Sequence, residues 1–160
     1  MQKESHRKGE LKQILVFRSA GLELGLDISC VREVLRPQPI CPVPKTPPFI
    51  EGVINLRGRI VALVDLAKRL NSTQAEEEPN PRIIVCRVNG FLVGLIVSRL
   101  REIIALSQEE IAPTPEIVSM QLDSEVISGM ARVGERIIPI IDLEHILTKR
   151  EEVELSTLGK

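Results

Sequence analysis

The apolar positions of this chain follow the two-residue period of β-strands in several short segments. Residues 22–28, LELGLDI, alternate apolar side chains with others, which is typical of a strand with one buried face. Residues 82–97, RIIVCRVNGFLVGLIV, place Asn89 and Gly90 between two apolar runs, and this pair tolerates the positive φ angles of a type I′ turn. The pattern predicts short strands joined by tight turns.

The strand pattern occurs twice along the chain. Residues 15–35 align with residues 84–104 at an offset of 69 residues, and residues 52–70 align with residues 129–147 at an offset of 77. Two matches in the same order, separated by one insertion, indicate an internal duplication. We call the two matching parts the first and second copies.

Each copy contains a further predicted hairpin, which turns at Arg57-Gly58 in the first copy and at Gly134-Glu135 in the second. Several short strands per copy are too few to bury two faces of an open sheet, so they favour a small closed barrel. Between the copies, residues 71–81 are polar and end in two prolines, which predicts an exposed loop. The predicted fold class is all-β with short helices.

An aspartate follows each of these hairpins. Asp65 precedes LAKRL and Asp142 precedes LEHIL, so each carboxylate is placed to accept from free N–H groups at the start of a short helix. The alternative is a hydrolase that uses the two aspartates as an acid–base pair. Such a pair would need small, loop-exposing residues after each aspartate, whereas Leu follows both. Helix capping is the favoured interpretation.

The composition argues against several classes of function. A net charge of −1 gives no general attraction to nucleic acid or to acidic membranes, and an aromatic content of 2% disfavours base stacking. The polar first twelve residues lack the apolar stretch of a secretory signal, and no apolar run approaches the ~18 residues of a membrane span. These features predict a cytoplasmic protein that neither binds nucleic acid nor inserts directly into a membrane.

The histidines and cysteines do not form a metal-binding motif. His6 lies in a predicted tail and His145 is alone in a predicted helix, while Cys30, Cys41 and Cys86 have no partner two to four residues away. We therefore expect no metal, no cofactor and no disulfide framework. A Cys–His nucleophile stays open, although no local motif supports one, and cysteines on apolar stretches are more often core residues.

Charged residues gather at two points of the first copy. Arg32, Glu33 and Arg36 follow the alternating strand, and Arg57 and Arg59 flank the glycine of the predicted turn. For Arg36 and Arg59 we favour a solvated rim. Arg57 differs because a guanidinium at a tight turn can brace a neighbouring loop through a two-pronged carboxylate contact. Glu33 is the candidate partner.

Residues 36–52, RPQPICPVPKTPPFIEG, form a proline-rich segment. Proline removes backbone donors and fixes φ, so the segment is predicted to be stiff and extended. Apolar Ile40, Val43, Phe49 and Ile50 lie between the prolines. These apolar side chains either seal one end of a barrel or form a surface that binds another protein. A rigid segment suits protein recognition because it loses little conformational entropy on docking.

Residues 49–66, FIEGVINLRGRIVALVDL, preceded by LELGLDISCVREV and VPKTPPF, closely resemble the CheW family of chemotaxis coupling proteins. The resemblance extends over residues 12–148. It implies a single domain of two intertwined five-stranded SH3-like barrels around a shared apolar core, with halves at about residues 15–70 and 82–147. The remaining residues, 1–11 and 149–160, are expected to be flexible tails.

The resemblance also implies a function and a set of contact residues. Members of the family are scaffolds rather than enzymes, and they connect the regulatory domain of the histidine kinase CheA to the cytoplasmic hairpin tips of chemoreceptors. A related pathway, such as one controlling twitching or gliding motility, stays open as the output. The residues that match receptor-coupling positions are Val31, Glu33, Arg57, Gly94, Leu100 and Ile103, with Glu33 and Arg57 expected to pair. The residues expected at the kinase contact are Ile40, Val43 and Pro44.

Overall fold

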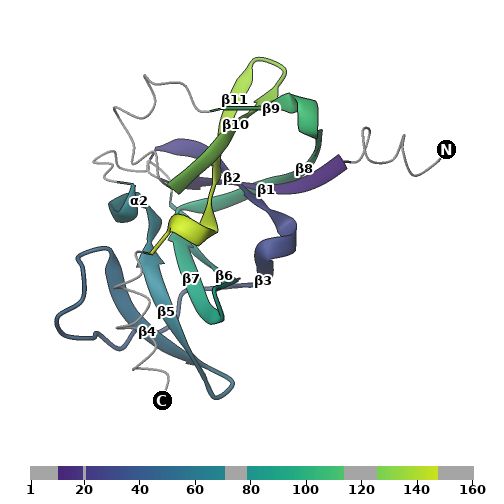
Figure 1. Ribbon diagram of the computed structural model, residues 1–160. Coiled ribbons are helices and arrows are strands. Elements are labelled where there is room, and N and C mark those ends of the chain that lie inside the picture. Colours follow the sequence, from purple (N-terminus) through teal and green to yellow (C-terminus); the bar gives the residue numbers. More distant parts are fainter. Residues whose placement is uncertain (1–10, 20, 71–78, 114–125, 148–160) are drawn as a thin grey trace.

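The structure is a computed structural model that describes residues 11–19, 21–70, 79–113 and 126–147 (Figure 1). This part of the chain is built from β-strands and a few short helical turns, which confirms the predicted fold class. The first copy contributes β1 (Leu11–Ser19), β2 (Leu22–Asp27), η1 (Ile28–Cys30), β3 (Val31–Leu35), β4 (Ile50–Leu56), β5 (Arg59–Asp65) and α2 (Leu66–Arg69). The second copy contributes β6 (Arg82–Val88), β7 (Phe91–Val97), β8 (Arg99–Ser107), η2 (Gln108–Glu110), β9 (Ile111–Ala112), β10 (Ile127–Val133), β11 (Arg136–Ile141) and η4 (Leu143–His145).

The strands form two sheets, and each sheet takes strands from both copies. Sheet A has the order β8-β1-β2-β11-β10-β9, and sheet B has the order β3-β6-β7-β5-β4. Replacing each strand of sheet B by its equivalent in the other copy gives β8-β1-β2-β11-β10, which is the order of the first five strands of sheet A; the sixth is the short strand β9. The two copies are therefore intertwined, and the internal duplication is present in the strand order. The SH3-like form of the barrels stays a prediction.

The predicted turns are present. Arg57 and Gly58 have φ angles of 52° and 86°, and Asn89 and Gly90 have φ angles of 47° and 86°. Two successive positive φ angles are those of a type I′ turn, whose twist matches the twist of the flanking strands. In the second copy, Gly134 begins the corresponding turn with a φ of 62°.

Gly25 and Gly94 show how closely the two copies agree. A Cβ added to Gly94 would lie 2.7 Å from Ile83 Cγ2 and 2.7 Å from Leu63 Cδ2. A Cβ added to Gly25 would lie 2.7 Å from Ile14 Cγ2 and 2.9 Å from Ile140 Cδ1, and these two residues are the equivalents of Ile83 and Leu63. Both glycines are required where a neighbouring strand packs directly on the backbone.

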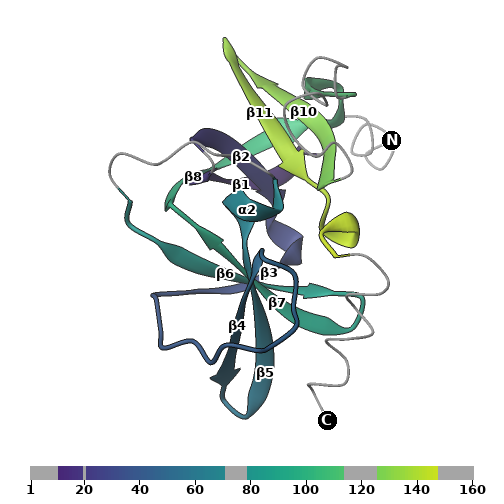
Figure 2. The same cartoon turned by 90° about the vertical axis from the view of Figure 1, so that its left-hand side faces the viewer.

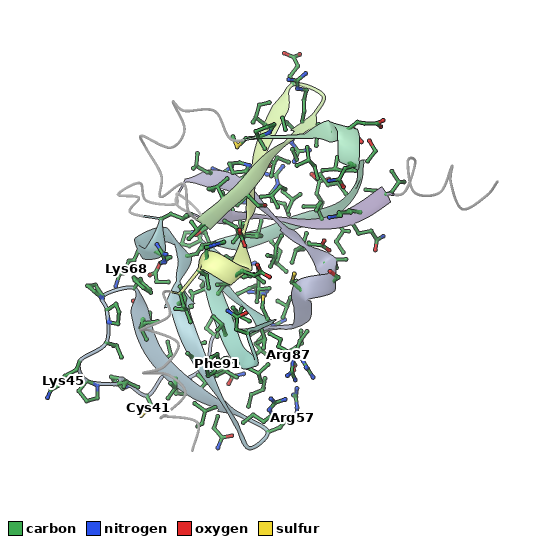
Figure 3. All side chains as sticks on the ribbon, viewed as in Figure 1. Cys41, Lys45, Arg57, Lys68, Arg87 and Phe91 are labelled. Atoms are coloured by element: carbon green, nitrogen blue, oxygen red, sulfur yellow. The ribbon has the colours of Figure 1, made fainter. Side chains whose placement is uncertain are left out.

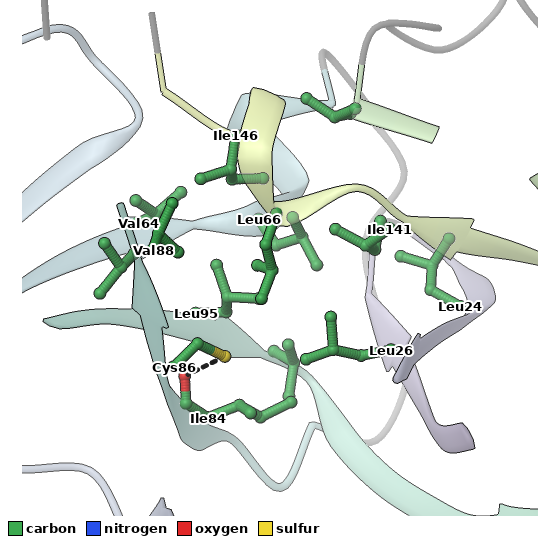
Figure 4. Packing of buried hydrophobic residues seen from close by; sticks show 14 of the residues in the cluster. Leu24, Leu26, Val64, Leu66, Ile84, Cys86, Val88, Leu95, Ile141 and Ile146 are labelled. Atoms are coloured by element: carbon green, nitrogen blue, oxygen red, sulfur yellow. Dashed lines mark hydrogen bonds between the residues drawn. The ribbon is translucent and has the colours of Figure 1, made fainter. Parts of the chain in front are cut away.

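The core has three parts. One apolar cluster lies within each sheet, and a larger cluster joins the two sheets (Figure 4). The shared cluster includes Leu24 and Leu26 from sheet A and Val64, Ile84 and Leu95 from sheet B. Figures 1 and 2 show α2 between the two sheets, where its Leu66 belongs to the shared cluster. The sheets therefore pack as one body around aliphatic side chains.

The predicted bounds of the domain, residues 12–148, stay a prediction. Strand β1 begins at Leu11, one residue before the predicted start of the domain. The rest of the predicted tails, together with most of the loop predicted at 71–81, lies outside the described residues.

Candidate functional site

The Arg57 guanidinium donates from Nη2 to Oε2 of Glu33, which confirms the predicted pair. Arg57 lies in the turn between β4 and β5, and Glu33 lies on β3, so the contact joins the two ends of sheet B in its strand order. A sheet whose first and last strands are bridged in this way must curl. The Arg57 side chain is 70% exposed and that of Glu33 is 31% exposed, so the pair is accessible to a partner.

Further exposed arginines lie on β3, β5 and β6 or directly after β3. Arg32 and Arg36 lie on and just after β3, Arg59 begins β5, and Arg87 is near the end of β6, which pairs with β3. Figure 3 shows Arg57 and Arg87 on the same side of sheet B. The solvated rim predicted for Arg36 and Arg59 agrees with their exposure.

The equivalent end of sheet A, beside the turn between β10 and β11, carries an ion-pair network that the sequence analysis missed. We call this end of each sheet its mouth. Glu23 Oε1 accepts from Nε and Nη2 of Arg136 at 3.1 and 2.9 Å, and Glu23 Oε2 lies 3.3 Å from Arg101 Nε. Arg136 also donates to Glu102 Oε2 at 2.8 Å. These contacts with Glu102 and Glu23 raise the pKa of Arg136 above its ordinary value. The sequence did contain a signal for this network. The arginines and Glu102 have identical equivalents in the first copy, whereas Glu23 aligns with an apolar residue, Leu92, in the second copy.

The apolar residues expected at the receptor contact occupy different environments. Val31 and Leu100 are equivalent residues of the two copies, and both are half-buried against the shared cluster. Ile103 on β8 is 55% exposed. Gly94 is buried, with β5 and β6 as its neighbours, so its direct contacts are internal.

The proline-rich segment covers the edge of sheet B. Cys41 forms an isolated β-bridge with Val53 on β4, with both backbone hydrogen bonds at 2.9 Å. Ile40 is 37% exposed, Val43 is half-buried and Pro44 is exposed. In sheet A the short strand β9 pairs with β10 in the corresponding place. The segment therefore has a structural role at this edge and still presents apolar surface.

Asp65 and Asp142 both act as caps. Asp65 Oδ1 accepts from Lys68 N at 3.3 Å, and Asp142 Oδ1 accepts from Glu144 N at 3.0 Å. Asp142 Oδ2 also lies 2.8 Å from His145 Nδ1. The short helix after Asp142 is a 3₁₀ helix, η4, whereas the one after Asp65 is α2. These contacts match the capping interpretation and leave the hydrolase alternative without support.

The three cysteines are free and differ in environment. Burial raises the pKa of the Cys86 thiol to about 12, with a smaller contribution from the nearby Cys30, so Cys86 is protonated at neutral pH. Burial, followed by the Asp27 carboxylate, also raises the pKa of Cys30. Cys41 is exposed and Cys30 is half-buried, so the core position that is more common for such cysteines is found only for Cys86.

Two further properties bear on function. The described residues contain no group of three or more His, Cys, Asp or Glu side chains that is arranged to hold a metal ion. Within the same residues, no helix is long and apolar enough to span a bilayer.

Comparisons with known proteins agree with this geometry. The family model of the CheW-like domain matches residues 13–151. The chemotaxis protein CheW of Klebsiella aerogenes is 30% identical, with 93% of this chain and 89% of that protein covered. The probable chemotaxis protein CheW of Rhizobium etli is 34% identical, with 88% and 90% covered. The crystal structure of the scaffolding protein TtCheW from Thermoanaerobacter tengcongensis has a TM-score of 0.80 at 36% identity, covering 88% of this chain and 94% of that one. The chain therefore belongs to the CheW-like domain family.

Proposed function

We propose that this protein is a cytoplasmic adaptor that couples chemoreceptors to the histidine kinase CheA. The similar proteins are named as chemotaxis and scaffolding proteins, so the role in chemotaxis is that of a scaffold and not of an enzyme. Among the structural observations, the exposed Glu33–Arg57 pair beside half-buried apolar residues supports the coupling role most directly. The protein reaches the inner face of the membrane through the receptors.

The proposed receptor surface combines apolar and charged positions. A receptor tip is a helical hairpin, and a helix presents an apolar stripe at i, i+3, i+4 and i+7. Val31, Leu100 and Ile103 supply aliphatic surface for such a stripe, and the Glu33–Arg57 pair supplies polar contacts beside it. Gly94 contributes by letting β5 and β6 pack closely rather than by touching the receptor.

The proposed kinase surface is the proline-rich edge segment with Ile40, Val43 and Pro44. Cys41 and Lys45, which mark this segment, lie on the opposite side of sheet B from Arg57 and Arg87 (Figure 3). A scaffold must hold both partners at once, and two separate faces make this possible. The bridge to Val53 holds the segment in place before binding, which lowers the entropy cost of docking.

Paired titrations test this assignment. Leu100→Asp places a charge in the apolar receptor surface and should weaken binding of a receptor cytoplasmic fragment while binding of the CheA regulatory domain is unchanged. Val43→Asp should have the opposite effect. Because both residues are half-buried, thermal melting must first show that each variant is folded.

One control variant and two possible outcomes decide whether the proposal fails. Gln108→Glu adds the same charge at an exposed position of η2 and should leave both affinities within about twofold. If wild-type protein bound neither partner, the coupling role would be wrong. If either folded variant lost both interactions, the division into two faces would be wrong.

A further inference from the structure

The two sheets carry the same arginines at equivalent positions but differ in the carboxylates around them. Arg32 and Arg59 in sheet B correspond to Arg101 and Arg136 in sheet A at the offsets of 69 and 77 residues. Glu33 corresponds to Glu102. The carboxylate that contacts both arginines of sheet A is missing from sheet B, where Leu92 corresponds to Glu23.

The backbones around these positions are also equivalent. In sheet B the β3–β6 register shifts between Val31 and Glu33, so Arg32 lies in the irregularity. In sheet A the β1–β8 register shifts at the matching place, where Arg101 lies between Leu100 and Glu102. The two arginines are therefore presented by the same local distortion of an edge strand.

Sheet A neutralises its arginines internally. The Glu23 carboxylate lies between Arg101 and Arg136, and Glu102 contacts Arg136 as well. Two arginines and two glutamates meet at this mouth, so their formal charges cancel. The Glu23 side chain is only 17% exposed, which places its carboxylate inside the mouth rather than in open solvent.

Sheet B does not neutralise the equivalent arginines. Leu92 replaces the bridging carboxylate and is buried in the apolar cluster of this sheet, at 7% exposure. Glu33 is engaged by Arg57, which has no arginine equivalent in sheet A because Gly134 occupies that position. Within the described part of the chain, no side-chain hydrogen bond or ion pair joins Arg32 or Arg59 to another residue. Sheet B therefore has three arginines, Arg32, Arg57 and Arg59, and one glutamate, Glu33, at or near the positions that correspond to the sheet A network.

We infer that Arg32 and Arg59 bind a carboxylate supplied by a partner, as Arg101 and Arg136 bind the Glu23 carboxylate in sheet A. This inference rests on the proposed function, because the partner is an acidic side chain on the receptor tip that docks beside the Glu33–Arg57 pair. A guanidinium presents a planar set of donors that matches a carboxylate, and two of them around one carboxylate give a directional contact. The geometry of sheet A shows that this protein backbone holds a carboxylate between these two arginine positions.

A protein carboxylate fits this mouth better than a nucleic acid does. The sister site holds one glutamate rather than a row of phosphates. Nucleic-acid binding by phosphate contacts uses an extended basic surface, whereas the formal charge of this chain is −1. Cys41 and Lys45 of the proline-rich segment lie on the other side of sheet B from Arg57 (Figure 3).

The test uses the full chain and a purified receptor cytoplasmic fragment that contains the hairpin tip. Arg32→Gln and Arg59→Gln should each weaken binding by about tenfold, and the double variant should also show a smaller loss of affinity as salt is raised. Arg132→Gln is the matched control, because Arg132 is an exposed strand arginine of sheet A. The control should bind like wild type.

A second pair of variants tests the comparison with sheet A. Leu92→Glu installs the sister carboxylate, which should occupy Arg32 and Arg59 internally and weaken receptor binding. Leu92→Gln has the same shape without the charge and should weaken it less. If Leu92→Glu does not fold, the arginine variants decide the question.

The outcomes separate this inference from the proposed function. If wild-type protein does not bind the receptor fragment, the proposed function fails. If wild type binds but the double arginine variant binds equally well, with the same salt dependence, the carboxylate site is wrong. Arginine-dependent binding of a 20-base-pair DNA duplex would also overturn it, because the occupant would then be a phosphate.

Discussion

Arg69 and Ile146 occupy equivalent positions in the two copies and are joined by a direct hydrogen bond. Arg69 Nε donates to the Ile146 carbonyl oxygen at 2.6 Å, and Arg69 Nη2 donates to the His145 carbonyl oxygen at 3.1 Å. The Arg69 guanidinium carbon also lies 5.2 Å from the centre of the Phe49 ring. A contact between equivalent residues lies close to the axis that relates the copies. Arg69 therefore connects α2 of the first copy to η4 of the second.

Replacing Arg69 by Met should destabilise the fold by about 1–3 kcal/mol. Arg69 is only 8% exposed, so its loss leaves buried carbonyl oxygens without donors. Lys68→Met is the neighbouring control, since Lys68 is exposed and pairs with Glu51 at the surface, and it should cost less than about 1 kcal/mol. Urea denaturation of both variants measures the difference. Equal losses would contradict a role for Arg69 between the copies.

Arg57→Glu should weaken receptor binding with little effect on stability. The substitution places two carboxylates together, but the pair is largely exposed, so the free energy of unfolding should fall by no more than about 1 kcal/mol. The double variant Arg57→Glu with Glu33→Arg restores opposite charges and should recover part of the affinity. Thermal melting and receptor titration check this. A large fall in melting temperature with unchanged binding would refute the role.

Gly94→Ala should destabilise the protein by about 1–3 kcal/mol through overpacking. The added Cβ would approach both Ile83 and Leu63 to 2.7 Å, which forces strands β5 and β6 to move. Adding Leu63→Ala opens space on one side, so the double variant should lose less than the sum of the two single losses. Additive losses in a double-mutant cycle would show that the Cβ is accommodated in another way.

The two aspartates should contribute to stability as caps and not as acid–base groups. Asp65→Ala and Asp142→Ala should each cost about 1 kcal/mol, whereas Asp65→Asn and Asp142→Asn should cost much less, because Asn is also a good cap. Chemical denaturation of the four variants gives the comparison. Equal losses for Ala and Asn would mean that the carboxylate charge matters more than the hydrogen bond.

Stability should fall at high pH because of Cys86. Its pKa is raised from an ordinary 9.0 to about 12, so the folded state holds the thiol proton more tightly than the unfolded state does. The resulting stabilisation is complete below pH 9 and is lost as the pH rises from about 9 towards 12, by about 1 kcal/mol per pH unit. Cys86→Ala should remove this part of the slope, and Cys41→Ala, at an exposed site, should retain it. Denaturation curves at pH 8, 9.5 and 10.5 measure both slopes, and a slope that Cys86→Ala leaves unchanged would contradict the assignment.

Local features of the fold were determined by the sequence itself. Asn89-Gly90 and Arg57-Gly58 turn where they were predicted, because few residue types accept successive positive φ angles. The aspartate caps also depend only on residues close together in the chain. The alternation predicted for β2 is not seen in its burial, because Leu24, Gly25 and Leu26 are all buried. The duplication was visible in the sequence because equivalent positions still carry similar side chains.

Other features were decided only by the tertiary structure, because they depend on how the two copies exchange strands. The order of sheet B, with β6 and β7 between β3 and β5, brings together segments from both copies. This exchange sets Arg136 of the second copy beside Glu23 of the first, and it buries Arg69 against η4. It also buries Gly94, which the resemblance had associated with the receptor surface. The sequence alone indicated a solvated position for Arg59. Its equivalent in the second copy, Arg136, contacts two carboxylates in the structure. The contact between Arg136 and Glu23 joins side chains that are 113 residues apart, and the local pattern carries no information about which side chains meet.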